Sequence, residues 1–193
     1  IFNTPNGSRA DILLRNMFYL IGGVPRAGKS TLAQKVVERK SIAFVSTDVI
    51  LHMVSDTLPD LGLTKPYDDI PTKFFPYISN LLKHLDSSVG AYTIEGDVLL
   101  PSQVVLLQKE YKIKACFLGF SHITLQQLEE HIGENDWISE LSDMEKADLP
   151  QWIMKKSIQM KQECDKYGLT YIDMSSDAYE KCLERAYLHL VQE

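Results

Sequence analysis

The sequence predicts an α/β protein in which helices cover both faces of a parallel β-sheet. Three observations predict this class. Short apolar runs typical of buried strands alternate with amphipathic segments along the chain. A glycine-rich turn joins the first apolar run to the first amphipathic segment. The length of 193 residues suits one domain with a full hydrophobic core.

Five apolar runs are interpreted as strands. Glycine or polar residues follow most of them, as expected where a strand ends and a loop begins. The runs are 17–21, 42–46, 91–94, 113–118 and 170–174. Ligands of parallel α/β sheets bind beyond the carboxyl ends of the strands, so the residues after these runs are the first candidates for a functional site.

Helices are predicted where apolar residues recur at intervals of three and four. The second begins at Asp48, and the last is expected to start at a capping box of Asp177 and Glu180. The predicted helices are 29–39, 48–54, 74–85, 102–111 and a final one that reaches about residue 191. Residues 58–71 contain three prolines and are predicted to form a loop.

The segment between the fourth and fifth strands, about residues 122–168, is too long for a simple crossover. It is helical in pattern and holds both tryptophans, Trp137 and Trp152, so we expect a lid insertion over the site. One domain is expected over residues 17–193. Residues 1–16 are interpreted as an N-terminal extension or an artificial remnant, with Met17 as the natural start.

Composition excludes several classes of function. The formal net charge of −6 gives no broad basic surface for nucleic acid, and no apolar stretch is long enough to span a membrane. Three widely spaced cysteines, Cys116, Cys164 and Cys182, do not form a disulfide framework. A reduced, cytoplasmic location is therefore expected, with Cys116 in the core.

The strongest motif is the sequence GVPRAGKS at residues 23–30, which matches the P-loop pattern Gly-x-x-x-x-Gly-Lys-Ser/Thr. Its glycines let the backbone wrap around an anion, and successive N–H groups at the start of a helix bind phosphate. Lys29 is expected to reach the β- and γ-phosphates, and Ser30 to bind Mg²⁺. The nucleotide-binding residues are expected to be Gly23, Val24, Pro25, Arg26, Ala27, Gly28, Lys29, Ser30 and Thr31.

Four further side chains near the strand ends are candidates for chemistry. Arg26 either contacts phosphate or substrate or is solvated, and Asp48 either accepts a proton from an acceptor hydroxyl or caps a helix. Glu95 directly ends the third strand and is the better candidate for holding Mg²⁺, with Asp97 two residues later. The alternative for Glu95 and Asp97 is a turn with solvated carboxylates. Lys29, Asp48 and Arg26 are the predicted catalytic residues.

The segment GGVPRAGKSTLA at residues 22–33, with Glu95-Gly96-Asp97 and Leu99-Leu100-Pro101 later, resembles small P-loop kinases. In particular, it resembles predicted kinases that are similar to 2-phosphoglycerate kinase, and nucleoside and nucleotide kinases share the wider fold of that family. The resemblance implies a P-loop NTPase three-layer sandwich, a five-stranded sheet in the order 2-3-1-4-5, ATP with Mg²⁺, and a mobile lid.

The chain departs from this family in its arginines. Nucleoside monophosphate kinases clamp phosphates with arginines in the lid and the acceptor domain, but no arginine occurs between Arg39 and Arg185. The expected lid offers only lysines, which lack the bidentate fork of arginine. The lysines are Lys146, Lys155, Lys156 and Lys161. A nucleotide monophosphate is therefore a less favoured acceptor.

The function predicted from the sequence is an ATP-dependent phosphotransferase that moves the γ-phosphoryl group of Mg·ATP to a small-molecule acceptor. One alternative is a nucleotide-binding switch or another NTPase, although the guanine-specific Asn-Lys-x-Asp motif is absent from the sequence. Another alternative is a toxin-type phosphotransferase that acts on a nucleotide sugar. It would share the same core, so the sequence leaves it open.

Overall fold

A five-stranded parallel sheet forms the centre of the computed structural model, which describes residues 16–64, 68–88, 90–130 and 137–192. The strands lie in the order β2-β3-β1-β4-β5. The fold class and the strand order predicted from the sequence are both confirmed. The strands are β1 (Phe18–Gly23), β2 (Ala43–Ser46), β3 (Tyr92–Glu95), β4 (Ile113–Gly119) and β5 (Thr170–Asp173).

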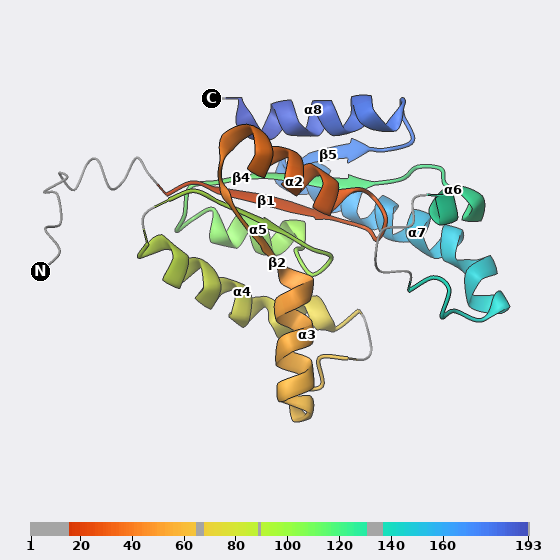
Figure 1. Ribbon diagram of the computed structural model, residues 1–193, viewed down its shortest axis with the longest axis horizontal. Coiled ribbons are helices and arrows are strands. Elements are labelled where there is room, and N and C mark those ends of the chain that lie inside the picture. Colours follow the sequence, from red (N-terminus) through yellow and green to blue (C-terminus); the bar gives the residue numbers. More distant parts are fainter. Residues whose placement is uncertain (1–15, 65–67, 89, 131–136, 193) are drawn as a thin grey trace, which may run out of the picture.

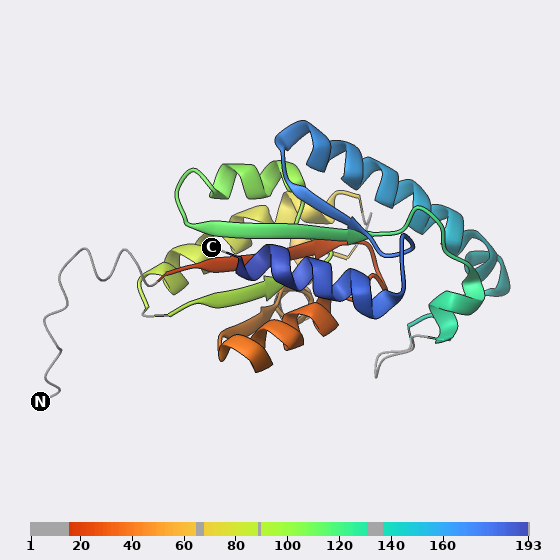
Figure 2. The same ribbon diagram turned by 90° about the horizontal axis from the view of Figure 1, so that it is seen from above.

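Helices cover both faces of the sheet (Figure 1). One face carries α2 (Lys29–Lys40) and α8 (Tyr179–Val191), which lie alongside each other (Figure 2). The other face carries α4 (Ile70–Asp86) and α5 (Pro101–Leu107). A separate cluster of buried apolar side chains packs on each face of the sheet. There are two clusters because the side chains of successive strand residues point to alternate faces.

Helix α2 ends at Lys40, and the next residue, Ser41, is its C-cap. Ser41 adopts a left-handed conformation with φ 53°, and its N–H donates to the carbonyl of Val37 at 2.8 Å. The chain then turns back into β2, an edge strand. From the carboxyl end of β2, α3 (Thr47–Thr57) projects away from the sheet (Figure 1).

The segment predicted as a loop over residues 58–71 contains a short 3₁₀ helix, Pro59–Leu61, and its last two residues already belong to α4. Residues 65–67 of this segment lie outside the described part of the chain. The N-terminal residues 1–15 also lie outside it, so the interpretation of the extension stays a prediction.

The segment between β4 and β5 divides into two parts. Its second part is α7 (Asp143–Tyr167), a 25-residue helix that packs on β4, β5 and α5 and therefore serves as the crossover helix. Its first part holds α6 (Leu125–Glu130), while residues 131–136 lie outside the described residues. A lid at about residues 122–168 stays a prediction, and the apolar contacts of α7 place much of that range in the core.

Helix caps differ from the sequence-based expectation at α8. The helix begins after Ala178, and the Asp177 carboxylate accepts from the N–H of Ala178 and pairs with Lys181 instead of capping the helix. The predicted capping box at Asp177 is wrong. A capping box does occur at the start of α7, where Ser142 and Glu145 bond reciprocally to each other's N–H groups.

The three cysteines are buried free thiols, and Cys116 belongs to the core as predicted. No helix within the described residues is both long and apolar enough to cross a membrane.

Candidate active site

The P-loop motif forms the turn that joins β1 to α2. The N–H of Val24 donates to the carbonyl of Leu118 at 3.0 Å, which ties the start of the turn to β4. A Cβ on Gly23 would lie 2.4 Å from that same carbonyl oxygen, so only glycine allows this approach. Gly28, with φ 89°, is the N-cap of α2 and brings no side chain to cap the helix. The first N–H groups of α2 are therefore available to an anion.

Lys29 closes this turn. Its side chain is only 7% exposed, and its Nζ donates to the carbonyl of Val24 at 2.9 Å and forms an ion pair with Asp97. Burial alone would lower the pKa of Lys29. The ion pair with Asp97 and the charges of the neighbouring carboxylates outweigh burial, so the pKa is raised and the side chain stays cationic.

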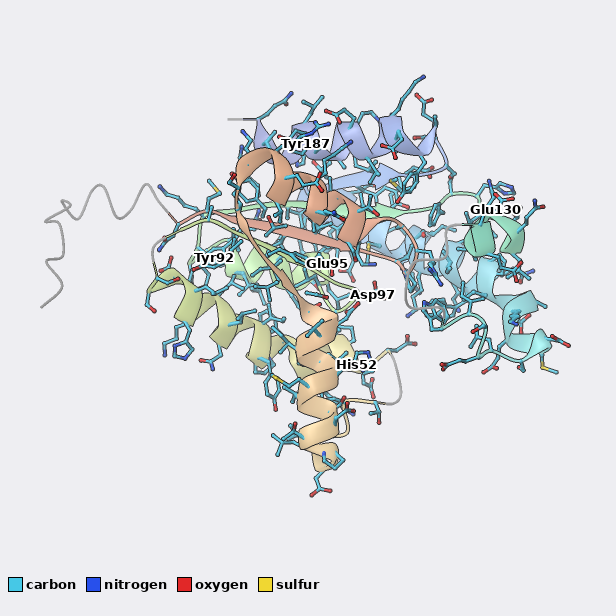
Figure 3. All side chains as sticks on the ribbon, viewed as in Figure 1. His52, Tyr92, Glu95, Asp97, Glu130 and Tyr187 are labelled. Carbon is cyan, nitrogen blue, oxygen red and sulfur yellow. The ribbon has the colours of Figure 1, made fainter. Side chains whose placement is uncertain are left out.

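Three carboxylates gather around Lys29 at the carboxyl ends of β2 and β3. The two strands are paired in register, with Ser46 opposite Glu95. Glu95 and Asp97 lie close together beside the first turn of α3 (Figure 3), and Asp48 comes from that turn. The side chains of Asp48, Glu95 and Asp97 are near enough to perturb one another electrostatically. The predicted convergence of strand ends is thus present.

Burial raises the pKa of Asp48, and the neighbouring Asp97 raises it further. Lys29 and a hydrogen bond from the backbone N–H of Asp97 act in the opposite direction. Burial also raises the pKa of Glu95, against a hydrogen bond from Ser46 and the charge of Lys29. Glu95 is only 2% exposed, and its Oε2 has no hydrogen-bond partner among the described residues. A buried carboxylate oxygen without a partner is suited to a cation.

Gly96 permits this crowding. It adopts φ 156°, and a Cβ at this position would lie 1.7 Å from the hydroxyl oxygen of Thr47 and 3.1 Å from a carboxylate oxygen of Asp48. Any side chain there would push the loop after β3 away from α3. The sequence did not indicate Thr47 or Gly96 as site residues, because their contact joins the segments that follow β2 and β3, which are far apart along the chain.

The residues fit Mg²⁺ in the manner of nucleotide enzymes. Within the described residues, no three His, Cys, Asp or Glu side chains converge closely enough to cage a metal ion by themselves. Mg²⁺ usually keeps several waters and takes one or two protein carboxylates together with substrate phosphates. The unpartnered oxygen of Glu95, together with Asp97, matches such a partial ligand set. The exposed Ser30 follows Lys29 in the first turn of α2.

Asp48, Arg26 and Thr31 are further residues that the sequence predicted for this site. Asp48 is the second residue of α3 and Ser46 precedes the helix, so Asp48 is not the N-cap. Arg26 has a left-handed φ of 64°, and its guanidinium lies 5.9 Å from the ring centroid of Trp137. Thr31 is exposed in the first turn of α2. The Arg26–Trp137 contact joins segments 111 positions apart (137 − 26), and no local pattern in the sequence predicts it.

No family model matches the sequence, and no curated protein matches it. Solved structures do match the fold. A gluconokinase from Sinorhizobium meliloti superposes with a TM-score of 0.57 at 15% identity, over 90% of this chain and 91% of that one. A sugar kinase from Janibacter sp. gives 0.56 at 15% identity, over 91% and 96%.

A shikimate kinase from Acinetobacter baumannii, solved with shikimate, gives a TM-score of 0.55 at 14% identity, over 93% and 94% of the two chains. The matches cover nearly the whole of this chain. At such low identity the likeness concerns the fold and not the substrate. The chain has the fold of the P-loop small-molecule kinases.

Proposed function

We propose that this protein is an ATP-dependent phosphotransferase that transfers the γ-phosphoryl group of Mg·ATP to a small-molecule acceptor. One observation carries the proposal. The buried lysine of a complete P-loop motif contacts Asp97 and lies within the electrostatic reach of Asp48 and Glu95. A nucleotide switch needs the phosphate loop, but it does not need a proton acceptor such as Asp48 beside it.

In this proposal the phosphates of ATP sit against the backbone N–H groups of residues 26–30, at the positive end of α2. Lys29 exchanges its partner Asp97 for phosphate oxygens and stabilises the charge that spreads over the transferring group. Because Lys29 is buried and cationic, its interaction with phosphate is little screened by water.

Asp48 accepts or orients the proton of the acceptor hydroxyl. Its raised pKa makes it a better proton acceptor than an ordinary aspartate, and the N–H of Asp97 fixes its orientation. Glu95, Asp97 and Ser30 would hold Mg²⁺, which supplies positive charge to the β- and γ-phosphates when bound. The unpartnered oxygen of Glu95 supports its part in this ligand set.

The acceptor is proposed to be a small hydroxyl or phosphate compound, and the reaction to take place in the cytoplasm. The solved structures of similar fold include a gluconokinase and a shikimate kinase, and the P-loop residues resemble 2-phosphoglycerate kinase-like proteins. Gluconate, shikimate and 2-phosphoglycerate are therefore the first acceptors to test, followed by neutral sugars and nucleotide sugars.

The test measures ADP release and acceptor phosphorylation from Mg·ATP with each acceptor. We expect acceptor-dependent ADP release that Lys29→Ala removes. Lys40→Ala is the matched control, because Lys40 ends the same helix and is exposed. Unchanged turnover in Lys29→Ala would overturn the proposal. Nucleotide binding without any acceptor-dependent turnover across the panel would favour the switch.

A further inference from the structure

A contact between the phosphate loop and the segment before α7 is not used by the proposed reaction. The guanidinium of Arg26 lies over the indole of Trp137 at 5.9 Å. Arg26 holds a left-handed backbone conformation, which is unfavourable for a residue other than glycine. Such conformations concentrate at functional sites, where the surrounding structure maintains them.

The position of Trp137 is fixed by its neighbour. Ile138 is 2% exposed and belongs to the same apolar cluster as Val24 and Ala27 of the phosphate loop. Leu141 packs against that cluster as well. The segment 137–141 is therefore anchored beside the phosphate loop, at the end of the sheet where α6 and the start of α7 lie (Figure 1). Trp137 itself is 36% exposed, so its ring covers the arginine and not the core.

The distribution of arginines along the chain bears on the role of the Arg26–Trp137 contact. No arginine occurs between Arg39 and Arg185, so the β4–β5 connection cannot offer the arginines that nucleoside monophosphate kinases place in a lid. Arg26 is the arginine that the phosphate loop itself provides. A cation–π contact uses the face of a guanidinium, whereas its N–H groups lie in the plane and match two phosphate oxygens. Stacking on Trp137 thus orients the group without using its donors.

We propose that Trp137 is a positioning residue that orients the guanidinium of Arg26 toward the phosphates of the bound nucleotide. In this arrangement the phosphate loop itself supplies the positive charge, and the β4–β5 connection contributes the aromatic surface that holds it. This inference rests on the proposed function, because it requires a nucleoside triphosphate on the P-loop.

The experiment is a double-mutant cycle on nucleotide affinity. Isothermal titration calorimetry measures the dissociation constant of the Mg²⁺ complex of adenylyl imidodiphosphate, a non-hydrolysable ATP analogue, for the wild type, Trp137→Leu, Arg26→Met and the double variant. We expect Arg26→Met to weaken binding about tenfold, as for a lost charge-assisted hydrogen bond, and Trp137→Leu about fivefold. The double variant should bind like Arg26→Met alone, since Trp137 acts only through Arg26.

Two further variants separate positioning from structure. Trp137→Phe keeps an aromatic face and should stay within about twofold of the wild type. Trp152→Leu is the matched control. Trp152 is 40% exposed, and the ammonium nitrogen of Lys156 lies 5.9 Å from the centroid of its ring. It should bind like the wild type.

The outcomes separate the two proposals. If the wild type fails to bind the analogue, the proposed function fails. If the wild type binds the analogue and this binding depends on Lys29, two results would overturn only the positioning role of Trp137. One is that Trp137→Leu binds the analogue as well as the wild type does. The other is that the affinity loss of Trp137→Leu adds fully to that of Arg26→Met in the double variant. If Trp137→Leu does not fold, as judged by thermal unfolding, Trp137→Phe and Trp137→His decide. Affinity near wild type in Trp137→Phe, with a loss in Trp137→His, supports positioning, and equal losses in both overturn it.

Discussion

Two charged clusters involve α2, an inner one at its buried first residue and an outer one in its partly exposed second half, and they differ in exposure and in balance. On the outer side, Lys35 and Arg39 both bond to Glu184 of α8, at 2.8 and 2.7 Å. This outer cluster is partly exposed, and its two cations face two acids, because Lys35 also lies 3.9 Å from Glu180. On the inner side, Lys29 is buried and faces the inner carboxylates Asp48, Glu95 and Asp97.

The pKa shifts of the two clusters have opposite signs. Hydrogen bonds from Arg39 and Lys35 lower the pKa of Glu184 to about 2. Burial raises the pKa of both Asp48 and Glu95. A cluster whose charges are satisfied holds two helices together, while a cluster with an excess of buried acid is prepared for a ligand that brings positive charge. The difference favours the functional role proposed for the inner cluster and a structural role for the outer one.

The largest effect should come from comparing the replacement of Lys29 with that of Lys35, a second lysine of α2. Lys29→Met removes the cation that we propose contacts the transferring phosphoryl group, and we expect turnover to fall by roughly 10²–10³-fold. Lys35→Met removes a cation of similar type from the outer cluster and should leave turnover within about twofold of the wild type. Steady-state ADP release under saturating Mg·ATP measures both. An equal loss of turnover in Lys29→Met and Lys35→Met would contradict the different roles assigned to the two clusters.

The next effect concerns stability in the absence of ligand. Glu95→Gln replaces a buried carboxylate, one oxygen of which has no partner, with a neutral amide of the same shape. We expect the free energy of unfolding to rise by about 1 kcal/mol while turnover falls. Urea unfolding at pH 7 measures the gain. A loss of stability in Glu95→Gln would mean that the carboxylate is already satisfied in the free protein.

The pH dependence of stability should differ in sign between the clusters. Because the pKa of Glu95 is raised on folding, its ionisation costs stability as pH rises above the ordinary glutamate value of 4.5. The stabilisation by Glu95→Gln should therefore grow as the pH rises above about 4.5. Glu184 has a lowered pKa, so its contribution is present above pH 4.5 and is lost as pH falls toward about 2.

Thermal unfolding of the wild type, Glu95→Gln and Glu184→Gln across this range measures both trends. The melting temperature of Glu184→Gln should lie below that of the wild type at neutral pH and converge with it in acid. Parallel curves for the two variants would contradict the assigned pKa shifts.

The smallest effect is that of salt on the outer cluster. The Arg39–Glu184 pair is exposed, so Arg39→Gln should lower the melting temperature slightly in dilute buffer. About 1 M NaCl should reduce the electrostatic part of that difference, since the Debye length is then about 3 Å. The contact of Arg39 with Tyr187, at 4.6 Å, should preserve a residual difference. A salt-independent difference would assign the whole effect to that stacking.

The parts of this molecule that the sequence predicted are those whose cause is local. The phosphate loop could be recognised because strand, glycines, lysine and helix follow one another directly. Asp48, Glu95 and Asp97 could be selected because each follows a strand, and parallel strands bring their carboxyl ends to one edge. The strand order came from the resemblance to small P-loop kinases, because apolar runs alone do not specify which strands become neighbours.

What could not be predicted depends on contacts between distant segments. The need for glycine at position 96 arises from Thr47 on another strand connection, and the orientation of Arg26 arises from Trp137. The capping box of Ser142 and Glu145 does have a local signature, but it lay inside a segment interpreted as an insertion. Asp177 and Glu180 show the same spacing without forming a box, so the spacing alone does not determine the cap.

The bond between Lys29 and Asp97 has a consequence for selectivity among anions. In the resting protein Asp97 acts as an internal competitor for the lysine, so a small anion such as sulfate must displace a carboxylate and leave it without a counter-charge. Under the proposed function, a magnesium-bound triphosphate would not incur this penalty, because it would deliver a cation to Asp97 as its phosphates took over the lysine. The protein would thereby discriminate against abundant inorganic anions by partner exchange.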